Sequence, residues 1–560
     1  MQSLLFQNVD AIGNDLDVHP ANEPVKSRRY VMTLFGRCAD GKSCAVEIHG
    51  FRPYMFVALD HSGPEDEMSH LVKSMGARVG NGRSNTQREE SLLRAAEYVG
   101  IESWEVVRRR RFRGFEDNRE RTFLRVNFYT RAAMRKAISK RYECYEDGQC
   151  RPRPGAPALY ESNIDPLVRF IDIAGIEPCN WIVVSNAKRG FCGSQTVAGG
   201  VNAFSASYES VRPPTVAERG TVPVFAPLRS LLFDLECESS HGAFPLAIKG
   251  YTRVAHDVVD LAGKIKDPSE LSACVHRRLL AALDPTDADK RLYLKCDDRD
   301  GETSEVDGAA VLSSTEGREA VASIVRRFLG GDVPDWKKHV RGWDRTKLSE
   351  FVEERIAAIL PGCGVHGDRI IQIGAIVTDI GTSRIRRVIF VLGGCDSIEG
   401  TVVRSFRDEG ALLCAFAAFV RGEDPDVLSG YNIIPFDFPY YFDRAKECGS
   451  DVLMAATDIG RLRRDQEAPH DSARRGPWPH LTPLLKLRNQ RLGSAAMGTN
   501  IWRRLDMSGR VQIDQCKIVR EGYSLASYKL DSVAGHFMFG TVDGVSARRS
   551  PEGGRALLRV

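Results

Sequence analysis

The stretch SLLFDLEC, residues 230–237, places two acidic side chains one residue apart directly after an apolar run. In a β-strand residues i and i+2 face the same way, so Asp234 and Glu236 project together while Leu235 faces the opposite side. Neighbouring carboxylates at the end of a buried strand repel each other and lose hydration, which calls for a positive partner such as Mg²⁺. The alternative is that both acids are simply solvated at the strand end.

A third acid follows in YNIIPFDFPYYFDRA, residues 431–445. Asp437 falls where a helix is predicted to begin, with Pro439 in the first turn, where a missing N–H costs little. The positive end of the helix dipole is expected to keep the Asp437 carboxylate ionised. The alternative is an ordinary N-cap aspartate. An acid on a second element is also what a two-metal site needs, in which the ions lie about 3.5 to 4 Å apart.

Composition narrows the class of protein. A chain of 560 residues is long enough for two or more domains, each with its own core. The 78 basic and 74 acidic residues give a formal charge of +4, so net charge indicates no particular partner. The 14 cysteines are scattered without a C-x-x-C pair, which argues against a zinc site or a disulfide scaffold and favours an intracellular protein. No apolar run long enough for a bilayer and no secretory leader is found, so we expect no membrane partner.

The order of strands and helices predicts an α/β protein, α+β overall. Residues 1–225 read as a β-rich amino-terminal domain, with a hairpin formed by VMTLFGRC and SCAVEIHGF around Asp40 and Gly41. Strands and helices alternate from residue 226, which predicts an α/β domain over 226–545. Helical candidates separated by charged loops fill 246–366, which we interpret as an insertion. Residues 546–560 are left as a tail.

These motifs resemble those of family B DNA polymerases. FDLEC with the trailing GAFP is similar to the first exonuclease motif of that family, and GYNIIPFDFPYYFDRA is similar to the second. LFGRCADGKSCAVEIHGFRPYMFV, GDRIIQIGAI and SLASYKLDSVAGHF resemble delta-type members in the expected order. The insertion resembles one in polymerases of large DNA viruses and related protist sequences.

The resemblance implies an RNase H-like domain from about residue 226, with 3′→5′ proofreading activity on a single-stranded DNA end. It implies that Asp234, Glu236 and Asp437 are catalytic acids that hold two Mg²⁺ or Mn²⁺ ions. It also implies that three residues of the second motif contact DNA, namely Tyr431, Asn432 and Phe436. Hydrolysis of this kind needs no nucleophilic side chain, because metals and a positioned water suffice.

The chain also departs from the family pattern. The third exonuclease motif, Tyr-x-x-x-Asp, is expected beyond SYKLDSVA, but no tyrosine follows residue 535, and YLKCD at 293–297 lies in the insertion, where we interpret it as a chance match. The palm motifs SLYPS and YGDTDS are absent. We therefore expect the amino-terminal and exonuclease portion of a polymerase for DNA replication, without palm, fingers or thumb and with weak or no activity alone. The alternative is an inactive nucleic-acid-binding or scaffold remnant.

Two further features leave alternatives open. The run RRRRFRGF mixes aromatic residues with Arg108, Arg109, Arg110 and Arg111, which suits contact with a DNA template backbone and its bases, but equally a charged, solvated strand edge. Asp514 lies on a predicted strand, either near the site or in a structural role. Accessory replication subunits are possible partners, and the place of action is the nucleus or a viral replication site.

Overall fold

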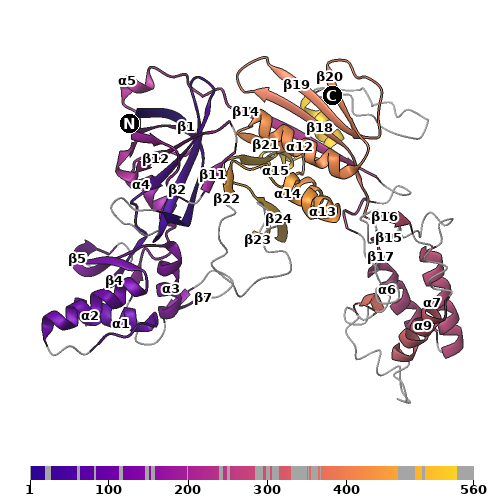
Figure 1. The fold of residues 1–560 in the computed structure, drawn as a ribbon, viewed down its shortest axis with the longest axis horizontal. Coiled ribbons are helices and arrows are strands. Elements are labelled where there is room, and N and C mark those ends of the chain that lie inside the picture. Colours follow the sequence, from indigo (N-terminus) through magenta and orange to yellow (C-terminus); the bar gives the residue numbers. More distant parts are fainter. Residues whose placement is uncertain are drawn as a thin grey trace.

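The protein is described here by a computed structural model, drawn in Figure 1. It describes residues 2–18, 27–59, 63–80, 84–111, 118–144, 150–152, 158–193, 195–198, 200–238, 244–248, 252–265, 267–283, 294–297, 303–305, 314–328, 350, 352–354, 363–365, 367–464, 486–494 and 498–538. Tyr293 of YLKCD and the predicted tail fall outside these residues. No helix of the described part is long and apolar enough to cross a membrane.

The amino-terminal region is β-rich, as predicted, and its first sheet closes on itself. The strand order is β1-β2-β3-β12-β10-β13, and β10 also pairs with β1. The strands are β1 (Gln2–Val18), β2 (Ser27–Cys38), β3 (Ser43–His49), β10 (Trp181–Arg189), β12 (Asn202–Ser207) and β13 (Val211–Arg212). The predicted β2–β3 hairpin is confirmed, and Gly41 adopts the positive φ of 82° that its tight turn requires.

A second amino-terminal sheet carries helices that the sequence analysis did not predict. Its strands are β4 (Tyr54–Ala58), β5 (Ile101–Arg110), β6 (Glu120–Phe128) and β9 (Leu159–Tyr160), in the order β5-β6-β4-β9. The helices are α1 (Pro64–Ser74), α2 (Asn85–Tyr98) and α3 (Arg131–Arg141). Apolar residues of α1 and α2, such as Leu71 and Leu92, share a buried cluster with Met55 and Leu124 of the sheet. Short elements complete the region: β7 (Tyr142–Cys144), β8 (Cys150–Pro152), α4 (Pro166–Ile173), β11 (Gln195–Val197), η1 (Tyr208–Ser210) and α5 (Val216–Arg219).

The following region is built on a six-stranded mixed sheet in the order β20-β19-β18-β14-β21-β25. Its strands are β14 (Arg229–Cys237), β18 (Ile370–Asp379), β19 (Ile385–Leu392), β20 (Thr401–Phe406), β21 (Val427–Gly430) and β25 (Val511–Asp514). The first three in the chain, β14, β18 and β19, are antiparallel neighbours, whereas β21 and β25 run parallel to β14. This is the RNase H-like arrangement that the resemblance implied.

Helices cover the sheet and bury its aromatic residues. They are α12 (Glu409–Glu423), α13 (Asp437–Glu447), α14 (Ser450–Ala456), α15 (Gln515–Gly522) and α16 (Leu530–Met538), and the remaining strands are β22 (Leu462–Arg464), β23 (Lys486–Ser494) and β24 (Gly498–Asp506). Phe233 of β14 lies between Phe416 of α12 and Phe438 of α13, with ring centroids 5.5 and 5.1 Å away. This core fixes α13, and hence its first residue, against β14.

The insertion is an appendage to the sheet. Its helices are α6 (Thr252–Lys264), α7 (Pro268–Leu283) and α9 (Thr315–Phe328), beside a small sheet of β15 (Leu294–Asp297), β16 (Thr303–Glu305) and β17 (Cys363–Val365). Figure 1 shows these elements apart from the central sheet, at the lower right. The two ends of the segment meet, because Leu246 and Asp368 exchange hydrogen bonds of 2.8 and 2.9 Å. β14 and β18, on either side of the insertion in the chain, pair as antiparallel neighbours, with a register shift between Glu236 and Cys237. The exact domain boundaries stay a prediction.

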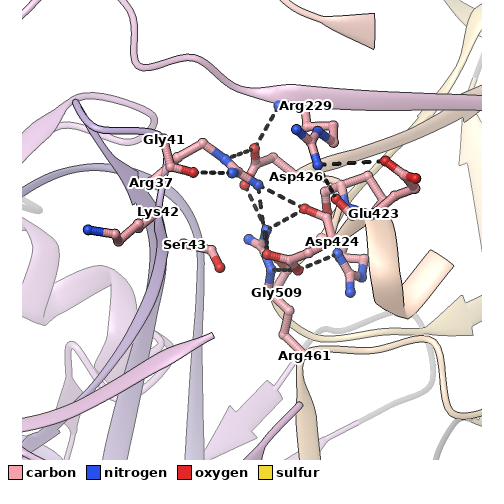
Figure 2. A network of polar contacts seen from close by, with 12 residues as sticks. Arg37, Gly41, Lys42, Ser43, Arg229, Glu423, Asp424, Asp426, Arg461 and Gly509 are labelled. Atoms are coloured by element: carbon pink, nitrogen blue, oxygen red, sulfur yellow. Dashed lines mark hydrogen bonds and ion pairs between the residues drawn. The ribbon is translucent and has the colours of Figure 1, made fainter. Parts of the chain in front are cut away.

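A buried network of charges joins the two regions (Figure 2). Asp426, just before β21, accepts hydrogen bonds from Arg37 of β2 (2.5 Å) and from Arg461 (2.8 Å). Asp424 accepts from Arg461 (2.8 Å) and Arg510 (2.9 Å). The side chains of Asp426, Arg461 and Arg510 have no exposed surface, and that of Arg37 has 6%. Charges so far from water are stable only when paired, so the network fixes how the regions pack.

Replacing Arg37 with alanine tests this packing. Loss of one partner of a buried ion pair costs about 3 to 5 kcal/mol, and we expect the lower end because Arg461 still faces Asp426. The matched control is Arg488→Ala, whose exposed pair with Asp506 is expected to contribute less than about 1 kcal/mol. Urea denaturation of both variants measures the difference, and equal midpoints would contradict the assignment.

Candidate active site

The end of β14 places the first two acids. β14 pairs with β21 from Ser230 as far as Leu232, and beyond Leu232 it has no strand partner on the β21 side. On its other side β14 continues to pair with β18. Phe233 and Leu235 are buried in the core, whereas Asp234 is half-buried and Glu236 is exposed. The alternation predicted from the sequence is therefore present. β14 is an inner strand, so the acids lie at the end of the sheet and not along its outer edge.

Asp437 occupies the position beside β14 that β21 leaves empty. It is the first residue of α13, and the backbone N–H of Leu235 donates to its Oδ1 at 3.1 Å. Phe436, not Asp437, is the N-cap residue, and it makes no side-chain capping bond. The interpretation of Asp437 as an ordinary N-cap is therefore wrong. The carboxylate instead bridges the start of a helix and the backbone of the strand that carries Asp234.

Burial and mutual repulsion dominate the electrostatics of these acids. Burial, and then the charge of Asp234, raise the pKa of Asp437 to about 8. Burial, and then the charge of Glu236, raise the pKa of Asp234. The helix dipole contributes about 0.3 to 1 kcal/mol, too little to keep Asp437 ionised against these effects. The expectation that the dipole would do so is wrong for the metal-free chain.

The donor set suits a hard divalent cation. No ion pair links any of the three acids to another described residue. Within the described ranges no three His, Cys, Asp or Glu side chains are arranged to hold a metal ion together. Carboxylate oxygens that lack a cation partner are nevertheless the ligands that Mg²⁺ and Mn²⁺ prefer. The residues therefore fit such an ion, whose charge would remove the repulsion.

Phe436, the residue before Asp437, contacts a second phenylalanine ring. Phe436 is half-buried, and its ring centroid is 5.4 Å from that of Phe244 and 5.3 Å from that of Tyr440. Phe244 is 74% exposed. The sequence analysis predicted Phe436 but not Phe244, although Phe244 belongs to the GAFP segment that follows the first motif. An aromatic residue in a polar, glycine-containing loop was the available signal.

The other two residues predicted to contact DNA lie in the loop between β21 and α13. The Tyr431 hydroxyl donates to the backbone carbonyl of Tyr528 at 2.6 Å, so it serves the structure. Asn432 has a left-handed backbone with a φ of 65°, and its side chain is exposed. Of this pair, Asn432 alone presents a side chain outward.

The arginine run is not brought together with the acids. Arg108, Arg109 and Arg110 end β5, an outer strand of the second amino-terminal sheet, which Figure 1 shows far from β14. All three are exposed, and Arg108 forms a long, exposed pair with Glu120 at 3.8 Å. The guanidinium of Arg111 lies 5.5 Å from the ring of Tyr160. Contact of this run with DNA stays a prediction.

The chain is similar to several known proteins. Residues 357–533 match the family described as DNA polymerase family B, exonuclease domain. The DNA polymerase of Pyramimonas orientalis virus is 26% identical over 549 residues, 93% of this chain and 41% of the viral protein. The DNA polymerase delta catalytic subunit of Dictyostelium discoideum is 22% identical and aligns with 90% of this chain and 32% of its own. A solved family B DNA polymerase from Pyrobaculum calidifontis covers 95% of this chain and 39% of its own, with 18% identity and a TM-score of 0.42.

The chain is thus similar to family B DNA polymerases, and its residues 357–533 match the exonuclease domain of that family. It spans 41% and 32% of the length of the two curated relatives named above. The resemblance stated from the sequence motifs is confirmed.

Gly430, at the end of β21, tests how tightly the site is assembled. A Cβ on Gly430 would lie 2.5 Å from the carbonyl oxygen of Phe233 and 2.4 Å from Cγ2 of Ile433. We expect Gly430→Ala to cost about 1 to 3 kcal/mol by overpacking and to displace the strand that carries Asp234. Gly422→Ala in α12 meets nothing within 4 Å and should be neutral or stabilising. Denaturation midpoints compare the two, and a neutral Gly430→Ala would contradict the close approach.

Neutralising Asp437 should stabilise the metal-free chain. Its pKa of about 8 in the folded chain exceeds the ordinary carboxyl value of 3.8, so the native state holds a proton that the unfolded chain releases. Stability contributed by this group is complete below pH 3.8 and is lost as the pH rises toward 8. In EDTA, the stability of Asp437→Asn relative to the wild type should therefore increase as the pH rises from 5 to 8. Thermal unfolding across that range measures the gain, with Asp451→Asn on α14 as control.

Proposed function

We propose that this chain acts as the 3′→5′ exonuclease part of a family B DNA polymerase for DNA replication. Its reaction is hydrolysis of the terminal phosphodiester of a single-stranded DNA end. The observation that carries the proposal is the position of Asp437, buried against the backbone of the strand that bears Asp234 and without a cation partner. Such a group of acids costs stability, and that cost is offset when a cation binds.

Asp234, Glu236 and Asp437 are the residues that would hold two Mg²⁺ or Mn²⁺ ions. Bound divalent ions supply the charge that activates water and stabilises the leaving oxygen in phosphodiester hydrolysis. The acids differ in exposure: Asp437 is 2% exposed, Asp234 is half-buried and Glu236 is exposed. Glu236 therefore lies on the solvent side, from which DNA would enter, and Asp437 lies on the buried side of the site.

The aromatic pair and Asn432 suit recognition of a single-stranded end. Phe244 and Phe436 offer ring surfaces on which bases stack, a contact worth about 1 to 3 kcal/mol per base and tolerant of sequence. Asn432 offers an exposed amide for a phosphate or a base edge. A mispaired end, which leaves the duplex easily, is the substrate that this arrangement favours.

The rate of hydrolysis by these residues is expected to be low. The third motif, Tyr-x-x-x-Asp, has no counterpart after residue 535, and among the described residues Asp531 is exposed on α16 while Asp514 is committed to backbone donors. Loss of one preorganised group of this kind costs about 10²- to 10³-fold. A second candidate function is an inactive nucleic-acid-binding or scaffold protein with the same fold, which is favoured by the commitment of Asp514 to backbone donors.

DNA is the proposed partner, as a single-stranded primer end and a template strand. Template contact by Arg108 to Arg111 belongs to the same proposal, and it rests on the exposure of Arg108, Arg109 and Arg110 along an outer strand. An intracellular place of action, in a nucleus or at a viral replication site, follows from the function. Accessory replication subunits are compatible with it.

Two assays on the purified chain test the proposal. With Mg²⁺ or Mn²⁺ and a 5′-labelled single strand, we expect binding with slow shortening from the 3′ end, and Asp234→Ala should abolish the shortening. Asp451→Ala, a change of an exposed acid on α14, is the matched control. On a primed template we expect no nucleotide incorporation, because SLYPS and YGDTDS are absent from these residues.

The outcomes separate the two functions. Binding without any Asp234-dependent cleavage would favour the inactive protein. Cleavage at rates typical of enzymes would mean that the residues present suffice, and incorporation would overturn the expectation that these residues do not polymerise DNA.

A further inference from the structure

Asp514 lies at the end of β25 with both carboxylate oxygens engaged. Its Oδ1 accepts from the backbone N–H groups of Asn432 (2.9 Å) and Cys516 (3.0 Å), and its Oδ2 accepts from that of Ile434 (3.1 Å). The residue is 6% exposed. Two of these donors belong to the loop between β21 and α13, about eighty positions away in the chain.

This geometry argues against Asp514 as a third metal-binding acid. A metal ligand needs a lone pair that faces the metal-binding space. The two carboxylate oxygens of Asp514 instead face three backbone N–H donors and are buried. A carboxylate that accepts several backbone hydrogen bonds is strongly held in place. Asp514 is also the N-cap of α15, which commits it to its own helix as well.

The loop that Asp514 holds continues into the first turn of α13. The carbonyl of Asn432 accepts from the N–H of Phe436 (3.2 Å), and the carbonyl of Ile433 accepts from that of Phe438 (2.9 Å). Ile433 is fully buried between these bonds. Asn432 has a left-handed backbone, which asparagine adopts more readily than most residues other than glycine.

Other bonds close the same end of the sheet. The Ser429 hydroxyl donates to the carbonyl of Ile513 (3.0 Å) and accepts from the Gln515 side chain (3.3 Å). Gly430 and Asp514 are register partners in the β21–β25 pair. The strand that enters the loop is therefore also bonded to β25 and to the start of α15, and Asp514 supplies the bonds within the loop itself.

We propose that Asp514 is a positioning residue of the exonuclease site, which holds the Asn432–Ile434 loop and, through the first turn of α13, fixes Asp437 against β14. The inference rests on the proposed function for its catalytic meaning. Its structural content does not depend on turnover, because the loop bonds exist in the chain without DNA or metal. A neutral residue that keeps one acceptor should preserve part of the arrangement.

Hydrogen–deuterium exchange tests the positioning directly. In Asp514→Ala, we expect amide exchange in a peptide covering residues 431–437 to be about 10- to 100-fold faster, as loss of charge-assisted hydrogen bonds implies. Asp514→Asn retains an oxygen for Asn432 and Cys516 and loses the bond to Ile434, so we expect a smaller increase. Asp531→Ala, an exposed acid on α16, is the control and should leave this peptide unchanged.

Metal dependence separates positioning from ligation. For a positioning residue, the Mg²⁺ concentration that gives half-maximal cleavage stays within about threefold of wild type in Asp514→Asn, while the maximal rate falls. A shift in Mg²⁺ requirement like that of Asp234→Asn would make Asp514 a ligand and overturn the inference, as would unchanged exchange in Asp514→Ala. If the wild type cleaves nothing, the proposed function fails, and the exchange experiment still decides whether Asp514 holds the loop.

Discussion

A carboxylate with none of its surface exposed, as at Asp426, requires cations around it, and the chain supplies them from distant segments. Arg37 comes from the closed first sheet of the amino-terminal region and Arg461 from the segment before the β23–β24 hairpin, and both pair with Asp426. Arg510, from the segment after that hairpin, pairs with the nearby Asp424. Each of these charges alone in the interior would cost several kcal/mol. The network therefore forms only when the two regions assemble together, and it sets the position of the strands that follow it.

Two short strands carry that constraint to the candidate site. β21 begins directly after Asp426 and β25 directly after Arg510, and they run parallel as register partners. Four residues of strand span about 13 Å, so the network and the acids are separated by little more than one strand length. One end of this pair is held by buried charges. At the other end Asp514 shapes the loop, and the acids gather where β14 has lost β21 as a neighbour.

Local spacing predicted the elements whose contacts are local. The i, i+2 arrangement of Asp234 and Glu236, the hairpin around Gly41 and the start of α13 at Asp437 were all readable, because each depends on neighbours a few residues away. Phe244, in contrast, meets Phe436 only once the chain is folded. The role of Asp514 and the pairing of Arg37 with Asp426 join residues 80 to 389 positions apart, which no periodicity encodes. The state of Asp437 was misjudged because a dipole was weighed without the burial that opposes it.

The change of sequence pattern near residue 226 therefore does not separate two independently stabilised regions. Gly509 approaches Phe35 so closely that a Cβ there would lie 2.8 Å from the ring, and β11 pairs with β22 across the same boundary. If the segment from residue 226 were moved to another protein by recombination, Asp426 would be buried without Arg37. The surface around Gly509 would also lose its contact with Phe35. The unit that packs together is the pair of regions, so the closed first sheet supports the sheet that bears the acids.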